Sequence, residues 1–181
     1  KGIKNKNIID ICGKPKMNYS IEAAINAECF DRVILSTDSE HYAELASIAG
    51  AAVIYRDELV SNDTATTYMV LEDLFRKIQV DFDYFMLLQP TSPLRDHTNI
   101  IEAVDLFESL FSSFDFLVSV KEAEHPRILV NQIGEDHSLK FFDTDFSNYQ
   151  RQAFKDYTPN GAIYIAKPKA YLLQKHFYGA K

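Results

Sequence analysis

Residues 86–95 read MLLQPTSPLR, and this stretch decides how the rest of the chain is interpreted. Its first four residues are apolar or favour strands, and Pro90 follows them. Because proline has no N–H to donate, it ends the hydrogen-bond ladder of a strand where it stands. In open α/β sheets, ligands bind beyond the carboxyl ends of the strands. The stretch therefore predicts a buried strand that delivers Gln89, Thr91 and Ser92 to a binding site.

Segments with helical spacing of apolar residues alternate with short apolar runs along the chain. The helical segments are residues 19–28, 40–49, 66–78 and 99–111, and the strand-like runs are 32–37, 52–55, 84–89 and 116–120. Strands that are apolar on both faces and alternate with helices are typical of a parallel sheet covered on both sides. The pattern predicts a doubly wound α/β domain with three layers and a mostly parallel sheet.

Beyond residue 125 the pattern changes to short apolar runs with turns between them. We expect strands at residues 128–133, 139–142 and 162–166, with little helix. They predict a small mixed β extension over one edge of the sheet. Because no interdomain linker is visible, we expect a single domain over residues 1–181, with an extension at residues 126–160.

The composition limits the classes of partner. With 19 Lys and Arg against 26 Asp and Glu, the formal charge is -7, which disfavours binding to nucleic acid. No apolar run is long enough to cross a bilayer, and the start KGIKNKNIID is not a signal peptide. Cys12 and Cys29 have neither zinc-site nor disulfide-scaffold spacing. We expect both to be small buried residues of a cytoplasmic protein.

Six segments in the same order resemble one known family. LLQPTSPLR at residues 87–95 resembles the hallmark of the acylneuraminate cytidylyltransferases, also called CMP-sialic acid synthetases. The others are Lys1-Gly2-Ile3 with Lys6-Asn7 from a pattern SKGIxxKN, GKPKMNYSIEAA at residues 13–24, FDRVILSTDSE at 30–40, RDELVSNDTA at 56–65 and PNGAIYI at 159–165. The chain is therefore similar to this family over nearly its whole length.

The resemblance implies a fold and a reaction. The fold would be the Rossmann-like one of nucleotide-diphospho-sugar transferases. In the reaction, the anomeric hydroxyl of an N-acylneuraminate, a nine-carbon 2-keto sugar acid, would attack the α-phosphate of CTP and release pyrophosphate. Such a displacement depends on alignment and on neutralising phosphate charge, so Mg²⁺ or Mn²⁺ is the expected cofactor. The resemblance also implies a homodimer, with residues 126–160 serving dimerisation or the sugar side of the site.

The resemblance assigns residues to the site. The expected nucleotide-binding residues are Lys1, Gly2, Lys6, Asn7, Arg56, Asn62, Asp63, Thr64, Pro90 and Thr91, and the expected sugar-binding residues are Gln89, Thr91, Ser92, Arg151, Asn160 and Tyr164. Lys1 and Lys6 would neutralise the triphosphate and so act in catalysis, although a solvated basic terminus would also explain them. An arginine, two amides and a phenol suit a sugar acid that carries a carboxylate and an acylamino group. Thr158 departs from the family, in which many members carry arginine there.

Some of these residues also have plain structural interpretations. A helix N-cap would explain Asn62 or Asp63. Pairing with Asp96 or Glu102 would explain Arg95, which follows the strand turn. Relatives begin with an earlier strand and carry a pair of metal-binding aspartates in a later segment. We therefore expect the chain to be incomplete at both ends and not to contain the metal ligands.

Other functions remain open. The same chemistry could act on another nonulosonic acid, such as legionaminate or pseudaminate, or on 3-deoxy-manno-octulosonate. Asp143 and Asp145, in the stretch FFDTDF, form a DxD pair that suits a hard divalent metal in a glycosyltransferase, although a solvated turn would also explain the pair. The remaining alternative is a nucleotide-binding module without turnover.

Overall fold

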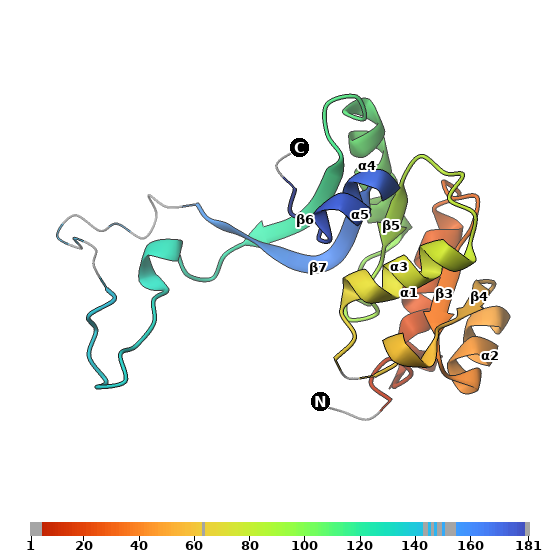
Figure 1. Cartoon of the computed structure of the whole chain (residues 1–181), viewed down its shortest axis with the longest axis horizontal. Helices are drawn as coiled ribbons and strands as arrows, with labels where there is room; N and C mark the ends of the chain where they lie inside the picture. The colour runs from red at the N-terminus through yellow and green to blue at the C-terminus, as the bar shows by residue number, and fades with distance from the viewer. Residues whose placement is uncertain are drawn as a thin grey trace. The chain divides into compact units, whose positions relative to one another are not determined.

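A computed structural model describes residues 5–62, 64–142, 145, 147, 150 and 155–179 of the chain (Figure 1). The chain divides into two compact units. Unit 1 comprises Lys1–Val118 with Gly161–Lys181, and unit 2 comprises Ser119–Asn160.

Unit 1 alternates strands and helices as the sequence predicts. Its elements are β1 (Asp10–Ile11), β2 (Lys14–Pro15), α1 (Lys16–Asn26), β3 (Ile34–Thr37), α2 (Glu40–Ile48), β4 (Ala52–Tyr55), η1 (Glu58–Val60), α3 (Thr67–Lys77), β5 (Phe85–Leu87), α4 (His97–Ser109) and α5 (Pro168–Gln174). Two longer strands, β6 (Phe116–Glu122) and β7 (Tyr157–Ala166), each have residues in both units. The predicted α/β class is confirmed.

Helices α2, α3 and α4 begin where a side chain accepts a hydrogen bond from one of their first free N–H groups. Ser39 caps α2, and Thr66 caps α3 by accepting a hydrogen bond from the Met69 N–H at 3.2 Å. Asp96 and Asn99 form a capping box at the start of α4. These local signals explain why the predicted and observed helix starts agree within a few residues.

The strands pair in separate sheets. β3 and β4 are parallel, with Ile34 opposite Ala52. β5 and β7 are antiparallel, with Leu87 opposite Tyr164, and β7 also pairs with β6. β1 and β2 form a small hairpin around Cys12 and Gly13, which have positive φ values of 54° and 84°.

The expectation that both cysteines are buried is wrong. Cys12 is exposed because it lies in this hairpin turn, and Cys29 is half-buried. Both are free thiols.

The residues of β7 alternate between two layers of the core. Ile163 and Ile165 pack with α1 and α4, whereas Tyr164 and Ala166 pack with α3 and α5. Since successive side chains of a strand point to opposite faces, β7 separates two helical layers. This is the three-layer arrangement that the sequence predicts.

Helix α1 also covers the second sheet. Met17 and Ile21 of α1 pack with Ala46 of α2 and with Leu35 and Val53 of the β3–β4 pair. The residues of β5, like most of those of β3, are half-buried rather than fully buried.

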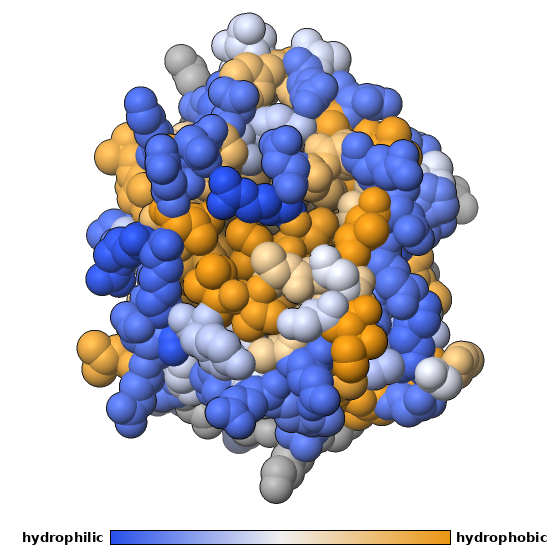
Figure 2. All heavy atoms as spheres, turned by 90° about the vertical axis from the view of Figure 1, so that its right-hand side faces the viewer, coloured by the Kyte–Doolittle hydropathy of each residue, from blue (hydrophilic) through white to orange (hydrophobic). Residues whose placement is uncertain are grey.

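Figure 2 shows an apolar area ringed by hydrophilic side chains on one face of the molecule. Among the described residues, no helix is long and apolar enough to cross a membrane.

Two strands expected in the extension are absent from the described part of unit 2. Residues 128–133 begin in a single 3-10 turn, η2 (Arg127–Leu129), and residues 139–142 form turns. Val130, Ile133 and Leu139 are exposed there, so their β-branched or apolar side chains have no pleated surface to pack against. The strand expected at 162–166 is confirmed as part of the longer β7.

Phe107 is the clearest test of the α4 layer. Its side chain is 2% exposed, and its ring centroid lies 5.2 Å from that of Tyr84 and 5.8 Å from that of Phe111. Phe107→Ala should lower the free energy of unfolding by about 3–5 kcal/mol, because it leaves a cavity among packed rings. Leu106→Ala on the same helix is the control, since Leu106 is 53% exposed. Equal effects of the two changes in chemical denaturation would contradict this packing.

Candidate functional site

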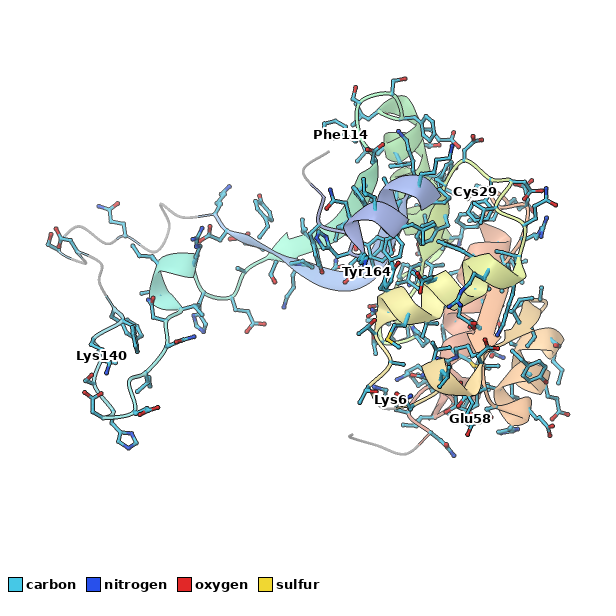
Figure 3. The ribbon with its side chains drawn as sticks, viewed as in Figure 1. Lys6, Cys29, Glu58, Phe114, Lys140 and Tyr164 are labelled. Carbon is cyan, nitrogen blue, oxygen red and sulfur yellow. The ribbon has the colours of Figure 1, made fainter. Side chains whose placement is uncertain are left out.

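A cavity of about 450 Å³ lies at the carboxyl end of β5. This volume suits a small-molecule ligand. Its lining comes from the end of β5, the start of α3, β7 and the segment that contains and follows α5: Thr66, Thr67, Tyr68, Leu87, Gln89, Tyr164, Tyr171, Lys175, His176, Phe177 and Tyr178. Two predicted sugar-binding residues, Gln89 and Tyr164, therefore line one cavity. Figure 3 shows Tyr164 on β7, beside α5.

Gln89 reaches the cavity because the chain turns directly after β5. The Ser92 N–H donates to the Gln89 carbonyl at 3.3 Å, which closes a turn over Pro90 and Thr91. The Thr91 hydroxyl lies 3.5 Å from the side-chain oxygen of Gln89. The turn orients the Gln89 amide, and its NH₂ and carbonyl supply both donor and acceptor capacity.

The turn is also tied to β7. Arg95 is 5% exposed, and its Nη1 donates to the Ala162 carbonyl at 2.8 Å. Burial lowers the pKa of Arg95 to about 10, so the side chain stays charged at neutral pH. The expected pairing of Arg95 with Asp96 or Glu102 is wrong, because the guanidinium turns inward to the backbone of β7 instead.

Aromatic residues form one wall of the cavity. The ring centroid of Tyr164 lies 5.0 Å from that of Phe177, which in turn lies 4.7 Å from that of Tyr171. Burial and a hydrogen bond with Tyr178 raise the pKa of Tyr164, and burial raises the pKa of Tyr171 to about 12. Both phenols are therefore neutral at physiological pH, where they can donate hydrogen bonds.

The charged groups at the cavity are basic. Lys175 ends α5 in the left-handed conformation, with a φ of 63°, and its ammonium lies 5.5 Å from the ring centroid of Tyr68. The next residue, His176, accepts a hydrogen bond at Nδ1 from the Tyr178 N–H at 3.1 Å. Among the described residues of the lining, none is aspartate or glutamate. The N-terminus of α3, at Thr66 and Thr67, adds partial positive charge. These groups favour an anionic ligand.

Sequence reasoning did not identify most of this lining. The residues of α5 and the segment 175–178 were not expected at the site. The sequence offered two signals for this part of the lining. One is the proline at the start of α5, and the other is the group of basic and aromatic residues after that helix. Only the fold shows that they face Gln89.

Three predicted nucleotide-binding residues lie between β4 and α3. Arg56 follows β4, and its Nη2 lies 3.3 Å from Oδ1 of Asp38. The Asn62 side-chain oxygen accepts hydrogen bonds from the N–H and the hydroxyl of Thr64, at 2.9 and 2.7 Å. Asn62 thus organises the turn before α3, but the N-cap of that helix is Thr66 and not Asn62. The loop leads directly to Thr66 at the cavity.

Of the other predicted residues that the structure describes, Lys6 and Asn7 belong to unit 1 and Asn160 belongs to unit 2. Lys6 is exposed, and the carbonyl of Asn7 accepts a hydrogen bond from the Met17 N–H at 2.8 Å. In unit 2, the Asn160 side chain accepts a hydrogen bond from the Ser119 hydroxyl at 2.6 Å and donates one to the Val120 carbonyl at 3.4 Å. Lys1, Gly2, Asp63 and Arg151 lie outside the described residues.

The described residues do not form a metal site. No group of three or more His, Cys, Asp or Glu side chains among them could hold a metal ion. Of the DxD pair, Asp143 lies outside the described residues. Hydrogen bonds from Ser147 lower the pKa of Asp145, including one from its N–H at 2.8 Å.

Gly161 tests how closely β7 approaches Gln89. Its φ is 77°, and an added Cβ would lie 3.4 Å from Oε1 of Gln89. Gly13 has a similar φ of 84°, but an added Cβ there would meet no atom within 4 Å. Each change to alanine should lower the free energy of unfolding by about 1–2 kcal/mol through backbone strain. Only Gly161→Ala should shift the side-chain NH₂ signals of Gln89 in an NMR spectrum; an equal shift in Gly13→Ala would refute the close approach.

Comparisons with known proteins agree with this geometry. The chain is 41% identical over 179 residues to the N-acylneuraminate cytidylyltransferase of Escherichia coli O18:K1:H7 strain RS218, covering 99% of this chain and 42% of that protein. It is 32% identical over 186 residues to the CMP-N,N'-diacetyllegionaminic acid synthase of Legionella pneumophila, covering 98% of this chain and 78% of that protein. The chain thus spans less than half the length of the first relative.

A solved structure has the same fold. It is that of a CMP:2-keto-3-deoxy-manno-octonic acid synthetase complexed with CTP, with a TM-score of 0.66 and 17% identity, covering 94% of this chain and 69% of that one. The family model described as cytidylyltransferase matches residues 1–181. The resemblance inferred from the six sequence segments is confirmed, and the chain belongs to the cytidylyltransferase family.

Proposed function

We propose that this protein transfers the cytidylyl group of CTP to an N-acylneuraminate, giving the CMP-sugar and pyrophosphate. The observation that carries the proposal is the cavity at the end of β5, where Gln89 and Tyr164 lie among basic and aromatic residues. A carboxylate could be held by Lys175 and by the N-terminus of α3. The amide of Gln89 and the phenol of Tyr164 could bind an acylamino group and hydroxyls. The 41% identity to an N-acylneuraminate cytidylyltransferase supports the choice of sugar.

The chemistry needs alignment and charge neutralisation more than a covalent intermediate. The loop from Arg56 to Thr64 would hold the nucleotide on one side of the site, and the turn from Gln89 to Ser92 would orient the sugar on the other. Lys6, with Lys1, would neutralise the triphosphate as pyrophosphate leaves. Mg²⁺ or Mn²⁺ remains part of the proposal, but the described residues do not supply its ligands, so no step is assigned to it.

A homodimer in the cytoplasm also remains a proposal. Val130, Ile133, Leu139 and Phe141 are exposed in unit 2, as an apolar contact surface would require. Phe177, by contrast, is buried in its own chain against Tyr164 and Tyr171. Unit 2 is therefore the better candidate for the dimer contact. Two free thiols fit a reducing compartment.

The activity can be tested by pyrophosphate release from the full-length protein. Four nucleoside triphosphates would be combined with N-acetylneuraminate, legionaminate, pseudaminate and 3-deoxy-manno-octulosonate, with and without Mg²⁺. We expect the highest kcat/KM for CTP with N-acetylneuraminate and little activity without the metal. A higher value for legionaminate would favour the alternative suggested by the Legionella relative. Strict preference for UTP or GTP would refute both, and CTP binding without turnover would indicate a binding module.

Lys6 tests the triphosphate side of the proposal. Lys6→Ala should cost about 2–4 kcal/mol of transition-state stabilisation, because one preorganised positive charge is lost. In the same assay kcat/KM would fall by roughly 30- to 1000-fold. Lys169→Ala, which removes an exposed lysine on α5, is the control and should leave kcat/KM unchanged. Unchanged turnover in Lys6→Ala would remove Lys6 from the mechanism.

A further inference from the structure

One ammonium group ties the end of β4 to helix α3. Nζ of Lys77 donates to the Tyr55 carbonyl at 2.8 Å and to Oδ2 of Asp73 at 2.9 Å, and it lies 2.6 Å from Oδ1 of Asp57. An ammonium has three protons, so these three acceptors use its full donor capacity. The Asp57 N–H completes the cluster by approaching Oδ2 of Asp73 at 3.4 Å.

Asp73 is an unusual residue to bury. It is 2% exposed, and it lies on a different face of α3 from Leu71 and Phe75, which pack into the core, because residues two apart on a helix do not share a face. Burial alone would raise the pKa of Asp73, but hydrogen bonds from Lys77 and Asp57 lower it below its usual range. The hydrogen bond to Asp57 raises the pKa of Lys77. Both groups are therefore charged at neutral pH. A buried ion pair rarely stabilises a fold more than apolar residues would. Stability therefore does not explain the pair of Asp73 and Lys77, and the positions of the groups that it holds are more informative about its role.

The geometry fixes the backbone on both sides of Arg56. Lys77 holds Tyr55, the residue before Arg56, and Asp57, the residue after it. The Arg56 N–H itself donates to the Thr37 carbonyl at 2.9 Å. With its backbone held at three consecutive residues, Arg56 extends its guanidinium from a fixed point, and Nη2 lies 3.3 Å from Oδ1 of Asp38.

The Arg56 side chain has unused donor capacity. Its Nε is buried and has no hydrogen-bond partner within the described part of the chain. Within the described contacts, the hydrogen bond to Asp38 leaves a guanidinium with five N–H donors incompletely satisfied. A carbonyl or phosphate oxygen of a nucleotide would satisfy it.

We propose that Asp73 and Lys77 are positioning residues for the nucleotide: they act through Arg56 and do not touch the substrate. The inference rests on the proposed function, because Arg56 is a nucleotide-binding residue only if the protein uses CTP. It adds two residues of α3 that face away from the described cavity lining. The expected consequence is that loss of either residue weakens nucleotide binding without altering the sugar side.

The experiment measures CTP binding to the full-length protein by isothermal titration calorimetry. Asp73→Asn keeps the shape and removes the charge, and Lys77→Met removes all three hydrogen bonds. Either change should weaken CTP binding by about 10- to 100-fold, the size of effect expected when a binding group is misplaced. KM for the sugar acid should stay within twofold of the wild-type value. Arg76→Met, one residue away on the same helix and bonded only to Glu72 within the described contacts, is the matched control.

A double-mutant cycle distinguishes positioning from a general loss of stability. If Asp73 and Lys77 act through Arg56, then Lys77→Met should weaken CTP binding by less than threefold once Arg56→Met is already present. Full additivity of the two changes would overturn the inference. If Asp73→Asn fails to fold, the same test can be made with Lys77→Met alone. The side chain of Lys77 is 28% exposed, so its replacement disturbs the core less.

Failure of the inference and failure of the proposed function give different results. If wild-type protein does not bind CTP, the proposed function fails and the inference fails with it. If wild-type protein binds CTP and both variants bind it equally well, the function stands and the inference is wrong.

Hydrogen exchange measured without nucleotide tests the hydrogen-bond cluster directly. The Asp57 amide should exchange faster in Asp73→Asn and not in Arg76→Met. Unchanged exchange at Asp57 would contradict the cluster itself.

Discussion

The antiparallel pairing of β5 with β7 is the contact on which both the core and the cavity depend. Its register places Leu87 opposite Tyr164 and Met86 opposite Ile165. Because side chains alternate along a strand, this register sends the isoleucines of β7 to the α1–α4 layer and Tyr164 to the α3–α5 layer. A slip of one residue would exchange the two sets. The phenol at the cavity and the aliphatic core are therefore determined by the same hydrogen bonds.

Two features of β7 lie beside the turn after β5. Gly161 adopts a φ of 77°, which glycine tolerates because it has no Cβ, and an added Cβ would lie 3.4 Å from Oε1 of Gln89. One turn further on, Arg95 buries a charged guanidinium to reach the Ala162 carbonyl. Burying a charge lowers stability, and a residue other than glycine would be strained at position 161. The two features occur at adjacent residues of β7, which is understandable if the orientation of Gln89 matters more than the lost stability.

The sequence predicts the local parts of this structure better than the long-range ones. α2 and β4 are predicted almost residue for residue, because Ser39, Gly50 and a β-branched run are signals within a few residues of one another. The strand predicted at 128–133 is wrong because strand propensity describes packing on a pleated surface, and no such surface is available to those residues. Gln89 was predicted as a site residue from the strand end at Pro90 as well as from a family motif, and Tyr164 from a family motif alone. The residues from Lys175 to Tyr178 could not be, since only the tertiary fold brings them beside Gln89.

The net charge of the chain and the charge of the cavity lining must be considered separately. The chain carries a formal charge of -7, yet its proposed substrates, a triphosphate and a sugar acid, are anions. Salt screens exposed charges beyond about 8 Å at physiological ionic strength, so the groups that line the cavity outweigh the distant carboxylates. There the described charges are Lys175 and the partial charge at the start of α3. An acidic surface thus excludes long polyanions, which must contact many distant charges at once, while a small anion meets only the basic lining.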